Sequence, residues 1–151
     1  MDRRELLVLR HAHAAGGAHV DSERPLSAQG SRQARVAAAW IAELAPDFVL
    51  ASPARRAAQT ATIVASTEAI EFDERLYDAT LATLLAVVLG SRGAEAGRTL
   101  VVAHNPGLTE LVMHLTGEVR GLGTACLARI ELPGEWTLAA GSGRLLEWRA
   151  P

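Results

Sequence analysis

The chain contains no lysine, and all 15 of its basic residues are arginine. Its one cysteine, Cys126, excludes an internal disulfide and a zinc site built from several cysteines, and it is typical of a reducing compartment. Aromatic residues make up only 4% of the sequence. A GC-rich codon bias explains most of the arginine excess, whereas a need for planar guanidinium groups is the functional alternative. Neither explanation says where the individual arginines act.

Long apolar runs and a large net charge are absent as well. The apolar run Leu6–Leu9 ends at Arg10, too short for the apolar region of a signal peptide, and no run approaches the roughly 18 residues that span a bilayer. The net charge is −2 and charged residues make up 21%, which indicates neither disorder nor a nucleic-acid partner. We therefore expect a cytoplasmic protein that binds neither nucleic acid nor membranes. The sequence is silent on its oligomeric state.

Short apolar runs alternate with segments of helical periodicity. Of the 151 residues 49% are apolar, which predicts one domain over residues 1–151 with a core of ordinary size. Strands are predicted at Leu6–Leu9, Phe48–Ala51, Ile70–Phe72 and Thr99–Ala103. Helices are predicted from Ser27 to about Leu44, from Ala54 to about Ser66, from Leu81 to Leu89 and after Asn105-Pro106. Ser52-Pro53 and Asn105-Pro106 both combine a capping residue with proline at the first helical position.

The C-terminal part has a different pattern. Short apolar segments at Cys126–Leu132, Trp136–Ala139 and Leu145–Trp148 are separated by Pro133-Gly134 and Gly141–Gly143, which predicts strands joined by hairpins. Strands that alternate with helices elsewhere predict βαβ units and a mostly parallel sheet. The expected fold class is therefore α/β, a three-layer αβα sandwich with a mostly parallel central sheet and antiparallel C-terminal edge strands.

Histidine and arginine follow the three clearest strands. Arg10 and His11 come directly after the first, Arg55-Arg56 follow the second within one helical turn, and His104 follows the third. Sites in open α/β sheets lie at the carboxyl ends of the strands, so we expect these side chains to meet at one edge. Each junction alone is compatible with an ordinary loop. Arginine or histidine at three such junctions together indicates a functional site at this edge of the sheet.

Such a cluster is suited to phosphoryl transfer without a metal. Guanidinium groups bind a tetrahedral oxyanion through paired N–H donors, and helix N-termini after Ser52 and after His104 add backbone N–H groups. A neutral histidine beside the anion can attack phosphorus, while a second, protonated histidine can stabilise charge on the phosphoryl oxygens. The residues therefore predict a phosphohistidine intermediate, and they require no cofactor and no metal.

The residues around these junctions resemble the histidine phosphatase superfamily. The segment Leu7–Ala12 contains Arg-His-Ala and is similar to the family's Arg-His-Gly signature after the first strand. Ser52–Thr60 resembles the second motif, Arg-Ala-x-Gln-Thr after Ser-Pro, and Val101–Asn105 resembles the strand that carries the second catalytic histidine. The order and spacing, with Arg24-Pro25-Leu26-Ser27 before Gly30, are most similar to the SixA-like phosphohistidine phosphatases. The resemblance covers nearly the whole chain.

The resemblance implies a role for each matching residue. His11 would be the nucleophile, and Arg10 and Arg56 would hold the phosphoryl oxygens. His104 would complete the pocket. Arg24 matches a position that often faces the substrate phosphate in relatives.

Ala12, His13 and Arg55 adjoin the residues that match the family motifs. Ala12 replaces the usual glycine, which requires a backbone with negative φ there. His13 forms a His-x-His pair with His11, but two ligands with no third nearby make a poor metal site, and a metal would occupy the nucleophile. Arg56, not Arg55, precedes Ala-x-Gln-Thr, so Arg55 is expected on the solvent side of its helix.

The general acid is the main departure from the family pattern. Many relatives place a glutamate in a longer insertion before the second histidine, whereas this region is short here. Asp78 fits best by pattern, and its position before a helix is equally consistent with a helix cap. An alkoxide leaving group needs a proton, whereas the protonated imidazole of a phosphohistidine leaves without one. A weak or missing acid therefore favours a phosphohistidine substrate.

The leading hypothesis is a metal-independent phosphatase that removes phosphoryl groups from phosphohistidine proteins through His11. The alternative within the family is a phosphatase or mutase that acts on a small phosphorylated metabolite, which predicts a working acid at Asp78. A candidate from a different class is a module that binds phosphorylated partners without turnover. The intact His11 argues against that candidate, because binding alone does not need a nucleophile.

Overall fold

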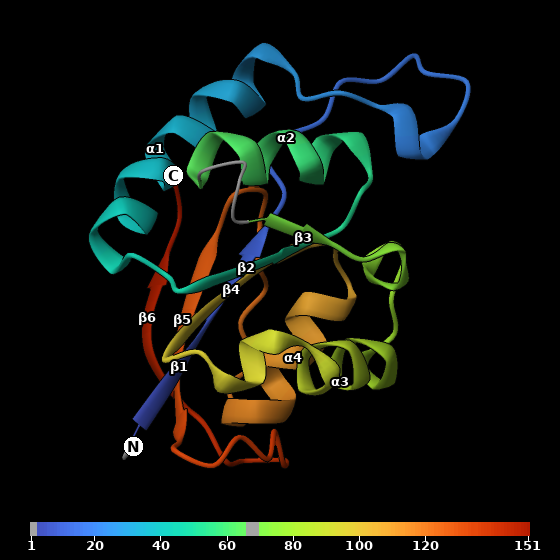
Figure 1. Ribbon diagram of the computed structural model, residues 1–151. Helices are drawn as coiled ribbons and strands as arrows, with labels where there is room; N and C mark the ends of the chain where they lie inside the picture. The colour runs from blue at the N-terminus through green and yellow to red at the C-terminus, as the bar shows by residue number, and fades with distance from the viewer. Residues whose placement is uncertain (1–2, 66–69) are drawn as a thin grey trace.

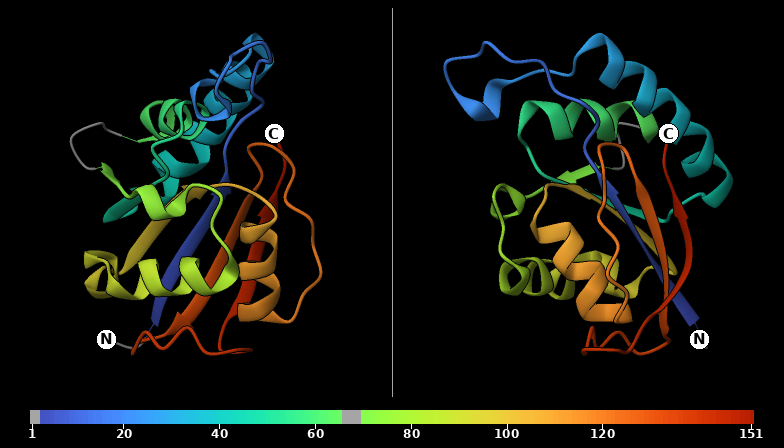
Figure 2. Two further views of the ribbon diagram at one scale, coloured as in Figure 1. Left: turned by 90° about the vertical axis from the view of Figure 1, so that its right-hand side faces the viewer. Right: turned by 180° about the vertical axis from the view of Figure 1, so that it is seen from behind.

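The computed structural model describes residues 3–65 and 70–151. It is a three-layer αβα sandwich in which helices α1 and α2 cover one face of a central sheet and helices α3 and α4 cover the other (Figures 1 and 2). The expected fold class is confirmed, including the antiparallel strands at the C-terminal edge. Within the described residues, none of the helices is long and apolar enough to cross a bilayer.

The elements alternate along the chain as the apolar pattern predicts. The strands are β1 (Arg3–Arg10), β2 (Phe48–Ala51), β3 (Ile70–Phe72), β4 (Arg98–Ala103), β5 (Leu127–Pro133) and β6 (Arg144–Arg149). The helices are α1 (Ala28–Leu44), α2 (Arg55–Val64), α3 (Leu81–Gly90) and α4 (Gly107–Thr116). The 3-10 helices among the described residues are η1 (Asp21–Glu23), η3 (Glu74–Leu76) and η4 (Arg92–Glu95).

The sheet has the order β3-β2-β4-β1-β5-β6. The pairs β3–β2, β2–β4 and β4–β1 are parallel, whereas β1–β5 and β5–β6 are antiparallel. Alternate residues of β1 serve different layers: Leu6 and Val8 pack in the core under α3 and α4, and Leu7 and Leu9 pack in the core under α1 and α2. All four side chains are fully buried, as expected for a central strand covered on both faces.

The helix starts differ in part from the prediction. Ser27 caps α1 as expected, because its side chain accepts a hydrogen bond from the backbone N–H of Gly30. Ser52 does not cap α2: the N-cap is Ala54, so Pro53 lies before the helix and not at its first position. The N-cap of α4 is likewise Pro106. The predicted end of the second helix at Ser66 lies outside the described residues.

The strand predicted at Trp136–Ala139 is wrong. This segment is irregular, and the partner of β5 is β6 alone on that side of the sheet. The Leu138 carbonyl lies 3.1 Å from the His114 ring Nε2 on α4. The residues that follow the segment also bind the end of α4: Gly141 N–H donates to the His114 carbonyl at 2.9 Å, and Gly143 N–H donates to the Leu115 carbonyl at 2.8 Å. Leu138 has a φ of 52° and its side chain is buried in the α3–α4 core. The apolar residues therefore pack as a loop under the helix.

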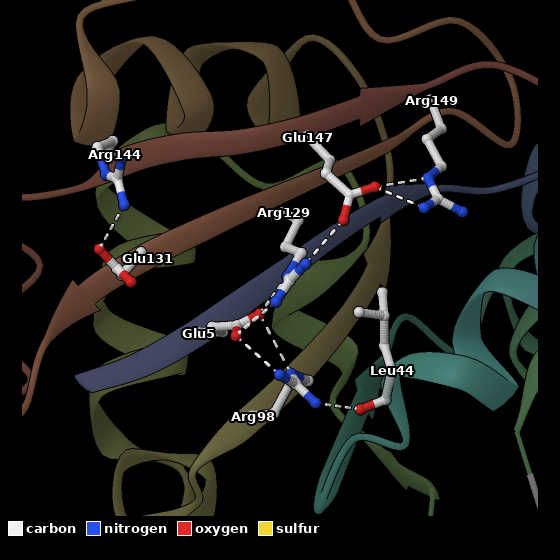
Figure 3. A network of polar contacts seen from close by, with 8 residues as sticks. All are labelled: Glu5, Leu44, Arg98, Arg129, Glu131, Arg144, Glu147 and Arg149. Carbon is white, nitrogen blue, oxygen red and sulfur yellow. Dashed lines mark hydrogen bonds and ion pairs between the residues drawn. The ribbon is translucent and has the colours of Figure 1, made fainter. Parts of the chain in front are cut away.

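β1 begins three residues before its apolar run. This first part of the strand lies in a network of charged side chains (Figure 3). The Glu5 carboxylate on β1 accepts hydrogen bonds from Arg98 on β4 and from Arg129 on β5, and Arg129 also donates to Glu147 on β6 at 2.7 Å. Arg98 reaches the backbone carbonyl of Leu44 at the end of α1. Four strands and one helix end are tied together in this way.

The network predicts acid sensitivity centred on Glu5. The hydrogen bond from Arg129 is the largest cause that lowers the pKa of Glu5, to about 2 from an ordinary value of 4.5. The stabilisation is therefore complete above about pH 4.5 and is lost as the pH falls toward 2. We expect Glu5→Gln to lower the free energy of unfolding by about 2–3 kcal/mol at pH 7 and by much less near pH 3, measured by urea denaturation.

Glu131→Gln is the matched control, because it removes one negative charge from the same sheet. The Glu131 partners Arg3 and Arg144 have side chains that are 67% and 73% exposed, so their ion pairs contribute about 0–1 kcal/mol. Equal destabilisation by the two variants would contradict the role given to Glu5.

Candidate active site

The structure brings five of the six residues predicted for the site into one cavity of about 280 Å³. The cavity lies at the carboxyl ends of the parallel strands, where sites occur in open α/β sheets. Its lining consists of Arg10, His11, His13, Ala14, Arg24, Arg56, His104, Asn105 and Thr124. Asp78, the sixth predicted residue, is not among them.

Strand register is what makes the side chains converge. Arg10 at the end of β1 pairs with Ala103 at the end of β4, and Ala51 at the end of β2 pairs with Val102. The hydrogen bonding continues one residue further, since His11 N–H donates to the Ala103 carbonyl at 3.0 Å. The three strands therefore end within about one residue of one another, and the residues that follow them share one space.

His11 is held in the tautomer that a nucleophile needs. Its ring Nδ1 lies 2.7 Å from the backbone carbonyl of Ala12, and a carbonyl only accepts, so Nδ1 carries the proton and Nε2 has the lone pair. The residue is 7% exposed. Burial is the largest cause that lowers the pKa of His11 to about 4, and the positive charge of Arg56 acts in the same direction. Its imidazole is therefore neutral at pH 7.

His104 lies beside His11, with ring centroids 5.1 Å apart. Its Nε2 is 2.8 Å from the hydroxyl of Ser52, and its Nδ1 is buried without a hydrogen-bond partner in the described chain. Burial lowers the pKa of His104 to about 3, with further contributions from His11 and Arg56. We expected a protonated His104. In the free protein the neutral form is favoured, because burial and neighbouring cations both disfavour a further positive charge.

Arg10 is fixed by a loop that the sequence motifs do not include. Its Nη1 donates to the backbone carbonyl of Leu122 at 3.2 Å, and Asn105 donates to the same carbonyl through Nδ2 at 2.6 Å. The loop is joined to the end of β1 by Ala125 N–H, which is 3.1 Å from the carbonyls of both Arg10 and His11. The segment before β5 therefore forms one wall of the cavity, to which it contributes Thr124.

Arg56 and Arg24 are both tied to Asp21 on η1. Arg56 donates through Nη1 to the Asp21 backbone carbonyl at 2.9 Å and through Nη2 to the Asp21 carboxylate at 3.0 Å. Arg24 donates through Nε to the Ala15 carbonyl at 3.0 Å and through Nη1 to the Asp21 carboxylate at 3.2 Å. Arg56 is 8% exposed, whereas Arg55 is an exposed residue, as expected from the position of each in the motif.

The other motif residues join the segments that carry the site. The Thr60 hydroxyl accepts from Ala12 N–H at 3.0 Å and donates to the Arg56 carbonyl at 2.7 Å, which fixes the turn after His11 against α2. The Gln59 side chain accepts from the Leu26 N–H at 2.8 Å and holds the segment that carries Arg24. Motif residues without reactive chemistry therefore set the positions of those that have it.

Gly30 is required by close packing on the same side. A Cβ at this position would lie 1.9 Å from the His13 carbonyl oxygen. Any residue other than glycine would therefore force the backbone to move. Ser27, the cap of α1, contacts the His13 ring Nδ1 at 2.7 Å. Helix α1 thus begins directly against the segment that follows His11.

Asp78 is neither a described lining residue of the cavity nor the N-cap of α3. It is exposed and lies outside the set of described residues that line the cavity. It is not the cap of α3, because the N-cap is Thr80, whose hydroxyl accepts from Thr83 N–H. Asp78 has a φ of 56°, a left-handed conformation that aspartate tolerates better than most residues.

Sequence reasoning missed several residues that shape the site. Ser52 was interpreted as a helix cap, but its hydroxyl contacts His104 and accepts from Ala54 N–H at 3.2 Å. Asp21 and Tyr77 belong to no motif, although Tyr77 donates to the Asp21 carboxylate at 2.6 Å and its ring lies 5.5 Å from that of His104. The Ser52-Pro53 pair at the end of a strand is a sequence signal that could have identified Ser52. No sequence signal identifies Asp21 and Tyr77, which come together only in the folded chain.

Comparison with known proteins gives one family. Residues 6–84 match the family model described as histidine phosphatase superfamily (branch 1). An uncharacterised protein of Mycobacterium tuberculosis is 33% identical over 125 residues, which are 81% of this chain and 78% of that protein.

Two solved structures agree over almost their full lengths. The structure of a proposed phosphohistidine phosphatase SixA from Nakamurella multipartitia is 29% identical with a TM-score of 0.88, covering 100% of this chain and 98% of that one. The structure of the protein histidine phosphatase SixA complexed with tungstate is 26% identical with a TM-score of 0.82, covering 97% of each chain.

The two buried histidines predict a loss of stability in mild acid. Their pKa values are about 4 and about 3 in the folded chain, below the ordinary 6.5, so the unfolded chain binds more protons. Stability should fall as the pH decreases from about 6.5 toward 4, by up to about 1.4 kcal/mol per pH unit for each histidine. In the double variant His11→Asn, His104→Gln we expect a clearly shallower decrease, measured by urea denaturation between pH 7.5 and 4.5.

The substitutions are chosen to keep the local hydrogen bonds. The asparagine amide can still donate to the Ala12 carbonyl, and the glutamine amide can still reach Ser52. His19→Gln, at an exposed position, controls for the loss of an imidazole elsewhere. If the free energy of unfolding depended on pH with the same slope in the wild type and the double variant, these histidines would not take up protons when the chain unfolds.

Proposed function

Because the chain belongs to the histidine phosphatase superfamily and is a phosphatase of the SixA-like branch, we propose that it removes phosphoryl groups from phosphohistidine side chains of proteins through a covalent intermediate on His11. The observation that carries the proposal is the state of the His11 ring, neutral with Nδ1–H on the Ala12 carbonyl and a lone pair on Nε2. A phosphate cavity lined by three arginines surrounds this nucleophile.

The first step transfers the phosphoryl group between two imidazoles. His11 Nε2 forms a bond to phosphorus while the N–P bond of the substrate breaks, and the substrate imidazole departs neutral because its other nitrogen already carries a proton. His11 becomes a phosphorylated imidazolium whose Nδ1–H stays on the Ala12 carbonyl. Donor and acceptor are chemically alike, so the transfer needs no external acid.

The second step is hydrolysis of the intermediate. Water attacks phosphorus, the N–P bond to His11 breaks, and the neutral imidazole is restored with its proton still on Nδ1. The products are the free enzyme and dihydrogen phosphate, which keeps both protons of the water. This balance again requires no proton donor from the protein.

The remaining cavity residues stabilise the charge on the phosphoryl oxygens. Arg10, Arg24 and Arg56 supply N–H groups beyond those already bound within the protein. The Ser52 hydroxyl donates a hydrogen bond to Nε2 of the neutral His104, so the ring proton is on Nδ1, where it can be donated to a phosphoryl oxygen. The dianionic phosphoryl group also raises the proton affinity of His104, which favours the imidazolium during the reaction.

The surroundings of Asp78 favour a phosphoramidate over a phosphomonoester. A phosphomonoester requires protonation of its leaving alkoxide. Asp78, the carboxylate expected to do this in a small-molecule phosphatase, is exposed and lies outside the set of described cavity residues. Phosphohistidine, whose leaving group needs no such acid, is therefore the substrate that the site suits best. A small phosphorylated metabolite is the alternative.

The substrate class is tested by comparing three substrates without added metal: a phosphohistidine protein, an aryl phosphate and a phosphoglycerate. We expect the highest kcat/KM for the phosphohistidine protein. His11→Asn should abolish turnover and the acid-labile phosphoenzyme trapped from a labelled substrate, because asparagine has no nucleophilic nitrogen. Full activity of His11→Asn would exclude the covalent mechanism.

Asp78→Asn separates the two substrate classes. If the leaving group needs no acid, this variant should hydrolyse the phosphohistidine protein within about twofold of the wild type. A loss of about a hundredfold or more, the size of a general-acid contribution, together with preference for phosphoglycerate would favour the metabolite phosphatase. Binding of phosphate without any phosphoenzyme would instead favour a module that only reads phosphorylated partners.

A further inference from the structure

The carboxylate of Asp21 binds two arginines that line the cavity and one tyrosine that is not among the described lining residues. It accepts hydrogen bonds from Arg24 at 3.2 Å, from Arg56 at 3.0 Å and from the Tyr77 hydroxyl at 2.6 Å. Its backbone carbonyl accepts a fourth bond, from Arg56 at 2.9 Å. The hydrogen bonds from Tyr77, Arg24 and Arg56 hold the pKa of Asp21 far below its ordinary value, so the group is a carboxylate under all conditions of interest.

Asp21 holds the two arginines without occupying the cavity. Arg24 and Arg56 are cavity-lining residues, whereas Asp21 is not among the described residues that line it. An arginine has five N–H donors in a rigid fork. For each of these two side chains the hydrogen bonds described above use two donors, which leaves others for a phosphoryl group.

The contact between Asp21 and Tyr77 joins the two helical layers across the sheet edge. Asp21 belongs to η1, which contacts α2 in the α1–α2 layer. Tyr77 directly follows η3, whose Leu76 is buried in the α3–α4 core. The Tyr77 ring also stands edge-on to His104, with 88° between the planes. A single carboxylate thus joins the cavity arginines of one layer to the tyrosine that packs against His104 in the other.

We propose that Asp21 is a positioning residue that holds Arg24 and Arg56, and through Tyr77 the ring that packs against His104, in the geometry that binds the phosphoryl group. The role rests on the proposed function, because the arginines are taken to bind a phosphoryl group. A free arginine side chain loses rotamer entropy when it binds a ligand, so a guanidinium that is held in place before binding loses less of it.

Electrostatics alone predicts the opposite effect of removing this charge. A negative group beside two cavity arginines weakens their attraction for an anion, so neutralising Asp21 would tighten phosphate binding if charge were its whole influence. If orientation dominates, neutralisation weakens binding instead. The sign of the change therefore distinguishes the two roles, and a residue that only stabilised the fold would leave phosphate binding unchanged.

The test is binding of inorganic phosphate to Asp21→Asn, measured by isothermal titration calorimetry at pH 7 and low salt. Asparagine has nearly the shape of aspartate but replaces one acceptor oxygen by an NH₂ group, so it cannot accept from Arg24, Arg56 and Tyr77 together as the carboxylate does. We expect phosphate to bind about tenfold or more weakly, as for the loss of one charge-assisted hydrogen bond. The rate of phosphoenzyme formation should fall at least as much.

Glu23→Gln is the matched control. It removes one negative charge from the same 3-10 turn, and Glu23 is exposed. Phosphate binding should be unchanged or slightly tighter in this variant. Circular dichroism and thermal unfolding verify that each variant folds, so a loss of binding can be assigned to the cavity.

Tyr77→Phe tests whether the tyrosine acts through Asp21. It removes only the hydroxyl that donates to the carboxylate, so it should weaken phosphate binding in the wild type and have little further effect in Asp21→Asn. Additive effects in this double-mutant cycle would overturn the role of Tyr77. Should Asp21→Asn itself fail to fold, the same loss of binding in Tyr77→Phe would support the proposal, and unchanged binding there would overturn it.

Unchanged or tighter phosphate binding by folded Asp21→Asn would overturn the positioning role whatever the substrate is. Phosphate binding that depends on Asp21, in a protein that does not hydrolyse phosphohistidine, would support the role while the proposed substrate fails. A wild type that binds no phosphate would overturn both.

Discussion

The site depends on the register of three parallel strands. β2, β4 and β1 are neighbours in the sheet, and their carboxyl ends differ by about one residue. A slip of one residue would turn every side chain of a strand to the opposite face and would separate His11 from His104. The register is fixed by the two cores, because Leu7 and Leu9 must face α1 and α2 while Leu6 and Val8 must face α3 and α4. The chemistry at the edge is thus a consequence of burial in the interior.

Arginine serves two purposes in this chain. Around Glu5, Arg98 and Arg129 each make three hydrogen bonds that hold the sheet together. At the carboxyl edge, Arg10 and Arg56 are fixed by backbone carbonyls or by a carboxylate and still keep donors for a ligand. Both uses need a fork of several N–H groups, which a lysine point charge cannot supply. The codon bias that removes lysine is therefore well tolerated at these positions.

Most of the fold and five of the residues that line the cavity could be predicted from the sequence, because both depend on short-range patterns. Apolar runs of four to six residues identify buried strands, and the residue after each run falls at the sheet edge. The supporting contacts could not be predicted. Asp21 and Tyr77 are 56 positions apart and meet only after both layers have packed. Trp136–Ala139 has the apolar content of a strand, but Trp136 and Leu138 pack against the α3–α4 core from an irregular segment.

The free cavity holds buried hydrogen-bond donors and positive charges that a bound anion would stabilise. Two imidazoles are kept neutral by burial next to three guanidinium groups, while Arg10 Nε and His104 Nδ1 are buried without a partner among the described residues. Such groups cost stability, since buried donors are normally satisfied. A dianion in the cavity would supply acceptors to these donors and favour protonation of His104. Because charge accumulates on the phosphoryl oxygens in the transition state, donors that are fixed before binding are most effective at that point. The free protein is less stable than it would be with these donors satisfied, and binding of a phosphoryl group would recover that stability.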